Sequence, residues 1–170
     1  SADYSSKANA LFEKYHPIEK NQNISLKKRK KLVKEWWIKH FNLLIKSGLS
    51  KNDIRKVINS NKLTLRKDFD EFINILKKYD IPLVIISSSG LGTDSIAMYL
   101  KKEKELFDNI YIISNSYQWN KKGKAVGINQ PIIHSLNKDE INLKNFSFFQ
   151  KIKNRKNVLL LGNSLEDIGM

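Results

Sequence analysis

The stretch IPLVIISSSGLG, residues 81–92, decides the fold that we predict for this sequence. It starts with a short continuous apolar run rich in branched residues, which is typical of a strand buried on both faces of a sheet. Two similar runs follow, NIYIIS at residues 109–114 and NVLLLG at residues 157–162, with helical patterns between them. Strands that alternate with helices predict an α/β fold with a mostly parallel sheet. A turn around Gly123 predicts a hairpin between the second and third runs.

The residues before this stretch have helical patterns. A first helix is expected near residues 4–15 and should end at HPIE, because Pro17 disfavours helix in the residue before it. A second helix should begin after Ser25, which can cap it, and stop at Gly48.

Two more helices complete this half of the chain. Ser50 and Asp53 have the spacing of a capping box, and residues 66–79 repeat apolar side chains on one helical face. We therefore expect a helical cap region at residues 1–78 and an α/β core at residues 79–170.

The composition limits the class of protein. A chain of 170 residues with 41% hydrophobic content can bury one sizeable core. No apolar run approaches the roughly 20 residues that span a bilayer, and there is no cysteine. We expect a cytoplasmic protein with no membrane partner.

The net charge of +14 indicates a positive potential that attracts anions. Most of the basic residues are lysine rather than arginine, whereas nucleic-acid recognition favours the arginine fork. The densest run, KKRKK at residues 27–31, is interpreted as an exposed first turn of a helix. Nucleic acid is therefore not favoured as the partner.

Residues at the carboxyl ends of parallel strands usually carry the chemistry of such folds. The first apolar run ends in Ser88, Ser89 and Gly90, directly before a helical pattern. Hydroxyl groups and the unpaired amides at a helix start can hold a phosphate group, since the helix dipole favours an anion. Serine-rich strand ends are also common turn chemistry, so this pattern alone favours an ordinary turn.

Two other segments carry groups suited to phosphoryl transfer. HSLNKDE, residues 134–140, places Lys138 in a loop, where its charge can neutralise a phosphate. GNSLEDIGM, residues 162–170, ends the third run with Asn163 and Asp167, a candidate Mg²⁺ site. Alone, Lys138 would be one surface lysine among many. Together with the serine loop, these segments predict the equipment for phosphoryl transfer.

In order along the chain, the motifs KYHPIE, VKEWWIKH, YDIPLVIISSSGLG, YIISNSYQW, IIHSLNKDE and VLLLGNSLEDIGM resemble those of one family. It is the pyrimidine 5′-nucleotidases, or cytosolic type III 5′-nucleotidases, of the haloacid-dehalogenase-like (HAD) superfamily. The resemblance implies a HAD-like, Rossmannoid three-layer core with a parallel sheet and an α-helical cap. It also implies Mg²⁺-dependent removal of phosphate from nucleoside 5′-monophosphates, pyrimidine ones such as CMP and UMP in particular, through an aspartyl-phosphate.

The resemblance implies roles position by position. Residues 88–90 match the motif that holds the phosphoryl group, and Lys138 matches the lysine that neutralises charge shared by nucleophile and phosphate. Glu19 matches the cap glutamate that receives the amino group of a cytosine-like base, which a carboxylate can do as an acceptor. His40 falls near a second base-contacting cap position, where the family more often has Ser.

The chain departs from the family pattern in two places. The fourth motif usually has Asp where Asn163 stands, while Asp167 is retained, and the neutral amide should weaken Mg²⁺ binding. The first motif, Asp-x-Asp-x-Thr, which supplies the nucleophile, is expected before residue 1. Asp68 and Asp70 imitate it in KDFDEF, but we interpret them as solvent-facing helix residues.

Three functions are open from the sequence. The first is a magnesium-dependent 5′-nucleotidase, with Lys138 and Asp167 in catalytic roles. The second is a catalytically inactive nucleotide-binding protein, which Asn163 and the unmatched first motif favour. The third is a basic nucleic-acid-binding protein, supported by net charge alone; its binding would fall steeply with salt and would be insensitive to Glu19→Ala.

Overall fold

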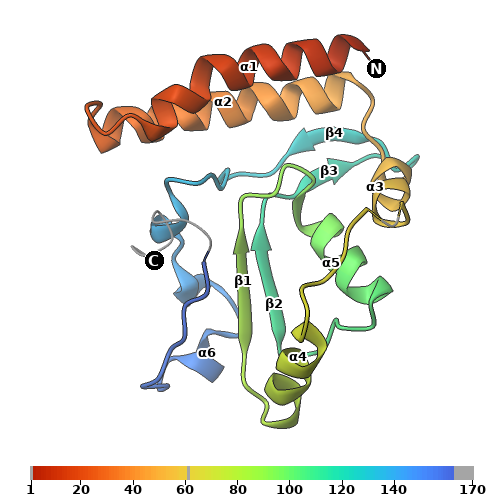
Figure 1. The fold of residues 1–170 in the computed structure, drawn as a ribbon, viewed down its shortest axis with the longest axis vertical. Coiled ribbons are helices and arrows are strands. Elements are labelled where there is room, and N and C mark those ends of the chain that lie inside the picture. Colours follow the sequence, from red (N-terminus) through yellow and green to blue (C-terminus); the bar gives the residue numbers. More distant parts are fainter. Residues whose placement is uncertain (1, 61, 163–170) are drawn as a thin grey trace.

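The computed structural model describes residues 2–60 and 62–162. In Figure 1, helices α1 (Ala2–Lys20) and α2 (Leu26–Lys46) lie side by side across one end of the molecule, and strands β1 (Leu83–Ser87) and β2 (Ile110–Ser114) point toward them. The α/β class predicted from the sequence is confirmed. Along the chain, the elements are α1 Ala2–Lys20, α2 Leu26–Lys46, α3 Lys51–Ile58, α4 Phe69–Lys78, β1 Leu83–Ser87, α5 Gly92–Lys102, β2 Ile110–Ser114, β3 Tyr117–Trp119, β4 Ala125–Ile128, the 3-10 turns η1 Lys138–Glu140 and η2 Leu143–Asn145, and α6 Phe149–Ile152.

Strands β1 and β2 form the centre of the fold. They pair in parallel, with Leu83 opposite Ile110 and Ser87 opposite Ser114, and apolar side chains alternate between the two faces of this pair. One face packs on α4 and α5, and the other on the segment from residue 133 to α6. This gives three layers, with the parallel pair in the middle. The first cluster includes Ile73, Leu76, Leu100 and Ile110, and the second includes Ile113, Ile133 and Phe148.

The antiparallel hairpin of β3 and β4 confirms the hairpin predicted around Gly123, whose φ of +70° suits glycine. Its apolar side chains pack against α2 in a cluster that contains Phe41 and Tyr117. The connection between α2 and α3 also joins the hairpin, because Ala125 N–H donates to the Leu49 carbonyl over 2.8 Å. Helix α2 and the hairpin are therefore one packed unit.

The predicted division into residues 1–78 and 79–170 is crossed by several contacts. Helix α4 packs its Ile73 and Leu76 in the same cluster as β1, β2 and α5. Helix α3 contacts α5 as well. The division stays a prediction, and α4 belongs by its packing to the layer that covers β1 and β2.

Helix α1 corrects the prediction that it ends at Pro17, since it continues to Lys20 with the proline inside it. Packing against α2 offsets the hydrogen bond that the proline lacks. Tyr15 is 1% exposed and its ring stacks on Trp36, with centroids 6.2 Å apart. The extra turn matters for function because it carries Glu19.

The prediction of a strand at residues 157–162 is also wrong, because these residues form neither a helix nor a strand. Val158 is 86% exposed and Leu159 is 76% exposed. A strand forms only when its backbone groups pair with a neighbour, and no described strand lies beside these residues. An apolar run predicts burial but does not supply the partner.

Local signals are confirmed at several helix ends. The Ser50 and Asp53 capping box is formed, and α2 ends just before Gly48, which has a φ of +80°. Ser25 does precede α2, but its side chain makes no capping hydrogen bond. Asp70 in α4 and Asp68 just before it are exposed, as predicted. No helix in ranges 2–60 and 62–162 is long and apolar enough to cross a membrane.

Candidate functional site

The loop after β1 is closed by hydrogen bonds of its own. Ser89 N–H donates to the Ser87 hydroxyl and Leu91 N–H donates to the Ser89 hydroxyl, each over 3.2 Å. The Ser89 hydroxyl also meets that of Ser95 at 3.5 Å. Ser88 takes part in none of these bonds. Of the two serines predicted to hold phosphate, Ser89 therefore shapes the loop.

The first residues of α5 lie in close contact with Asn115, which follows β2. Gly92 has a φ of +76°, and a Cβ on it would lie 2.6 Å from the Asn115 carbonyl oxygen. Gly92 N–H donates to the Ser89 carbonyl and Thr93 N–H to the Asn115 carbonyl, over 3.2 and 2.7 Å. Two amides at the helix start are therefore already bonded within the chain. A phosphate held here would depend on residues 88–90 more than on the helix start.

Helix α2 covers this loop. A Cβ on Gly90 would lie 3.4 Å from His40 Nε2 and 3.8 Å from Trp37 Cζ3, at ordinary van der Waals distance, so both rings pack directly over Gly90. The Tyr117 hydroxyl donates to the Gly90 carbonyl over 2.6 Å. Burial lowers the pKa of His40, which favours a neutral imidazole at pH 7. His40, predicted near the base, thus packs on the serine loop.

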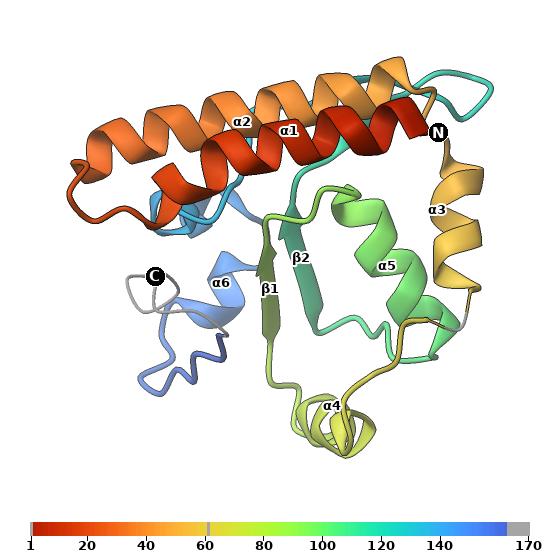
Figure 2. The same cartoon turned by 45° about the horizontal axis from the view of Figure 1, so that its top comes forward.

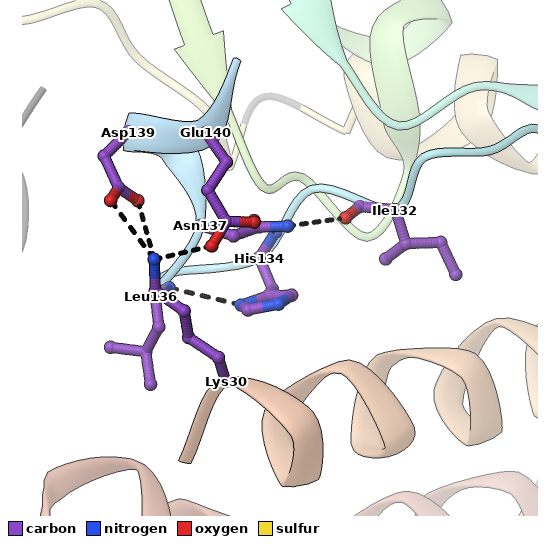
Figure 3. A network of polar contacts seen from close by, with 7 residues as sticks. All are labelled: Lys30, Ile132, His134, Leu136, Asn137, Asp139 and Glu140. Atoms are coloured by element: carbon purple, nitrogen blue, oxygen red, sulfur yellow. Dashed lines mark hydrogen bonds and ion pairs between the residues drawn. The ribbon is translucent and has the colours of Figure 1, made fainter. Parts of the chain in front are cut away.

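The segment that carries Lys138, residues 134–140, is folded around a buried histidine. His134 is 2% exposed, its N–H donates to Asn137 Oδ1 over 2.7 Å, and its Nδ1 accepts from Leu136 N–H over 3.3 Å. Asn137 Nδ2 donates to the Ile132 carbonyl over 3.0 Å (Figure 3). Burial lowers the pKa of His134 to about 4, so its ring is a neutral acceptor. Lys138 begins η1 directly after this network.

Both cap helices reach the same segment. Glu19, at the end of α1, is 8% exposed and accepts a hydrogen bond from the Ser135 hydroxyl. Arg29 Nη1 donates to the Glu19 carbonyl over 3.1 Å. Lys30 Nζ binds Asp139 at 3.1 Å and Glu140 at 2.7 Å, as Figure 3 shows. The predicted base-reading residue and the predicted phosphate lysine are therefore brought to one junction.

Asn115 ties the two loops together. It follows β2, is 1% exposed, and exchanges hydrogen bonds with Ile133: its Nδ2 donates to the Ile133 carbonyl and its Oδ1 accepts from Ile133 N–H, each over 2.9 Å. Its Nδ2 also lies 3.4 Å from the Ser89 carbonyl oxygen. The carboxyl ends of β1 and β2 thus meet the start of the Lys138 segment below α1 and α2, an arrangement that Figure 2 shows.

The predicted metal residues Asn163 and Asp167 lie outside the described residues. Within ranges 2–60 and 62–162, there is no group of three or more His, Asp or Glu side chains that could hold a metal ion. A cavity of about 420 Å³ lies between the end of β2 and the segment from residue 129 to 146; Asn137 and Glu140 line it, but none of the predicted site residues does. The Mg²⁺ site thus stays a prediction.

A comparison with known protein families identifies the family of this chain. The family model described as "Pyrimidine 5'-nucleotidase (UMPH-1)" matches residues 1–170. The chain belongs to this family. This confirms the resemblance stated from the sequence.

Relatives with assigned names cover the chain along its length. Proteins named 7-methylguanosine phosphate-specific 5'-nucleotidase from Homo sapiens and Gallus gallus are 34% identical over 161 residues and 30% identical over 170 residues. The matches cover 95% and 100% of this chain, but 53% and 58% of those proteins. The chain therefore spans a little over half the length of the curated relatives that it matches.

The fold is shared with a solved member of the group. The crystal structure of cytosolic 5'-nucleotidase IIIB bound to cytidine superimposes with a TM-score of 0.83 at 24% identity, covering 98% of this chain and 55% of that one. The α/β fold with a parallel sheet and a helical cap, implied by the resemblance, is thereby confirmed.

In this pyrimidine 5′-nucleotidase family member, sequence reasoning missed two residues of the junction. Asn115 directly follows the second predicted strand, and a polar residue at a strand's carboxyl end is a signal that could have found it. Lys30 belongs to the run that we interpreted as an exposed helical turn, and it is instead bound to two carboxylates. No local signal identifies its partners, which lie more than a hundred residues away.

Proposed function

We propose that the chain is part of an enzyme that hydrolyses nucleoside 5′-monophosphates, and that the junction below α1 and α2 binds the nucleotide. The observation that carries this proposal is the meeting of Glu19 with the segment of Lys138, next to the serine loop. A base acceptor, a phosphate-binding loop and a cation are the groups that such a substrate needs. Membership of the family supports the same reaction class.

Each residue has a role in this proposal. Ser88 donates to a phosphate oxygen, Lys138 stabilises the charge that develops on the phosphoryl group, and Glu19 accepts from the base. To accept from a base, Glu19 would give up its bond from Ser135. Cap closure over the loop by His40 and Trp37 keeps water from the phosphate.

The covalent step in this proposal uses an aspartate that none of the described residues supplies. Its carboxylate attacks phosphorus, the bond to the nucleoside 5′-oxygen breaks, and that oxygen leaves as a hydroxyl after taking a proton; water then releases phosphate. Mg²⁺ supplies charge neutralisation when bound. Asp167 and Asn163 are the candidate ligands.

The base preference proposed is for pyrimidines, with CMP ahead of UMP, because a carboxylate accepts from an amine and disfavours a carbonyl. The names of the relatives make 7-methyl-GMP a second candidate. Its positively charged base would suit the buried carboxylate of Glu19. The proposal keeps the cytoplasmic location expected from the sequence.

The test is phosphate release from CMP, UMP, GMP and 7-methyl-GMP with Mg²⁺. With the nucleophilic aspartate supplied by the complete enzyme, the expected result is phosphate release that is lost in Lys138→Ala and retained in Lys144→Ala, an exposed lysine in η2. Binding of CMP that depends on Glu19 but yields no phosphate would instead favour the inactive nucleotide-binding protein. If there is no turnover and no nucleotide binding, the proposal is overturned. Binding of nucleic acid that falls with salt and is unchanged by Glu19→Ala would favour the third function.

A further inference from the structure

The segment around Lys138 is held in two different ways on its two sides. Before Lys138, the His134 and Asn137 network fixes the chain through backbone contacts to Leu136 and Ile132. After Lys138, in η1, the ammonium of Lys30 from α2 forms ion pairs with Asp139 and Glu140 (Figure 3). The position of Lys138 is thus set by its own segment on one side and by α2 on the other.

Lys30 contacts the carboxylates of both Asp139 and Glu140 with its ammonium. Its ammonium lies 3.2 and 3.1 Å from the two oxygens of Asp139 and 2.7 Å from Glu140 Oε1. The Lys30 side chain is 20% exposed, whereas Asp139 and Glu140 are 45% and 57% exposed. A cation withdrawn from water needs a partner, and here the hydrogen bond to Glu140 is the main cause of a raised pKa for Lys30. The ammonium therefore stays charged at neutral pH.

We propose that Lys30 is a positioning residue that holds Lys138 toward the phosphate, through Asp139 and Glu140. This inference rests on the proposed function and deepens it. Lys30 lies in the second turn of α2, the helix whose His40 and Trp37 cover the serine loop. Helix α2 thereby aligns the two phosphate-binding groups, the loop and the lysine, with each other. A misplacement of about 1 Å is enough to slow such a reaction strongly.

The test compares three variants of the chain with the unchanged protein. Lys30→Met removes the contact, Lys30→Arg preserves the charge and the donors, and Lys31→Met removes the same charge from the neighbouring exposed lysine. The two methionine variants have equal net charge, so their long-range attraction for anions is matched. Five quantities are measured: amide hydrogen exchange of residues 135–141, the Kd of cytidine, the Kd of inorganic phosphate, and kcat and KM for CMP.

The expected result separates the phosphate end of the site from the base end. Lys30→Met should speed exchange in residues 135–141 about threefold, weaken phosphate binding severalfold and lower kcat about tenfold, while the Kd of cytidine changes less than twofold. Lys30→Arg should restore most of kcat, and Lys31→Met should behave like the unchanged protein. Equal effects of Lys30→Met and Lys31→Met on phosphate would overturn the inference, as would unchanged exchange in residues 135–141.

The proposed function and this inference fail in distinguishable ways. If the unchanged chain releases no phosphate, the proposed activity fails for this chain. The exchange and phosphate-binding measurements then still decide on Lys30. If turnover occurs but Lys30→Met leaves kcat unchanged, the inference fails and the proposed function stands.

Discussion

The two loops that form the candidate site are stabilised in opposite ways. The loop at residues 88–92 is held by short-range bonds among its own serines and by the tight approach of Gly92 to Asn115. The segment at residues 134–140 depends for its second half on charged contacts from α2. The first loop is therefore shaped by its own serines and by the end of β2, whereas the second half of the other loop is held by the cap.

The largest effect is expected for Gly92→Ala, which disrupts the loop at residues 88–92. The new methyl group would meet the Asn115 carbonyl at 2.6 Å in a left-handed conformation. The free energy of unfolding should fall by about 4 kcal/mol, as measured by urea denaturation. Gly48→Ala is the control, because Gly48 has a similar φ and nothing within 4 Å; it should cost about 1 kcal/mol. Equal losses would show that the close approach does not matter.

The next largest effect is expected for Asn115→Ala, which separates the two loops. It leaves the Ile133 N–H and carbonyl without their buried partner, so we expect a loss of about 3 kcal/mol in the free energy of unfolding. Asn129→Ala is the matched control, since Asn129 is exposed, and it should cost less than about 0.5 kcal/mol. Hydrogen exchange should rise in both loops for Asn115→Ala, and a rise in only one would contradict the link.

Acid should act on the segment of Lys138 through His134. Its pKa is about 4 in the fold and near 6.5 when unfolded, so the unfolded chain binds the extra proton between these values, and stability falls as the pH is lowered through this window. Burial is the main cause, while Glu140 and Asp139 oppose it and Lys30 and Lys34 add to it. About 2 kcal/mol should be lost between pH 6.5 and 4.5. Chemical denaturation of His134→Gln should show a shallower loss; an identical pH profile would refute this role.

The smallest effect is expected from salt, which sharpens the comparison without a mutation. Raising KCl from about 0.05 to 0.5 M screens the partly exposed ion pairs of Lys30 with Asp139 and Glu140. These ion pairs contribute less than about 1 kcal/mol to stability. Hydrogen exchange should increase modestly in residues 135–141 and stay constant in residues 88–92. A uniform change in both loops would mean that charge does not distinguish them.

The same contrast explains what could be predicted from the sequence. The Ser50 and Asp53 capping box depends on neighbours in the chain, and the strand at residues 83–87 has an apolar pattern of its own and a second such run to pair with; both were predicted. The end of α1 at Pro17 was predicted wrongly, because packing of Tyr15 against α2 overrides the local preference of proline.

The site was predictable only in part for the same reason. Residue types such as Ser88, Lys138 and Glu19 carry chemistry that a family pattern makes visible. That Glu19 meets Ser135, and that Lys30 meets Asp139, depends on how α1 and α2 are placed over the core. Such contacts join distant parts of the chain, and no periodicity or local motif encodes them.

The joining of Leu49 to Ala125 and of Lys51 to Gly123 has a consequence for chimeras. An exchange of helices α1 and α2 between two relatives would separate α2 from the hairpin of β3 and β4, although both contribute to one apolar cluster. A workable graft should carry residues 117–128 with the helices. The packing of the cap in such hybrids would then be inherited from two separate stretches of the gene, rather than from its beginning alone.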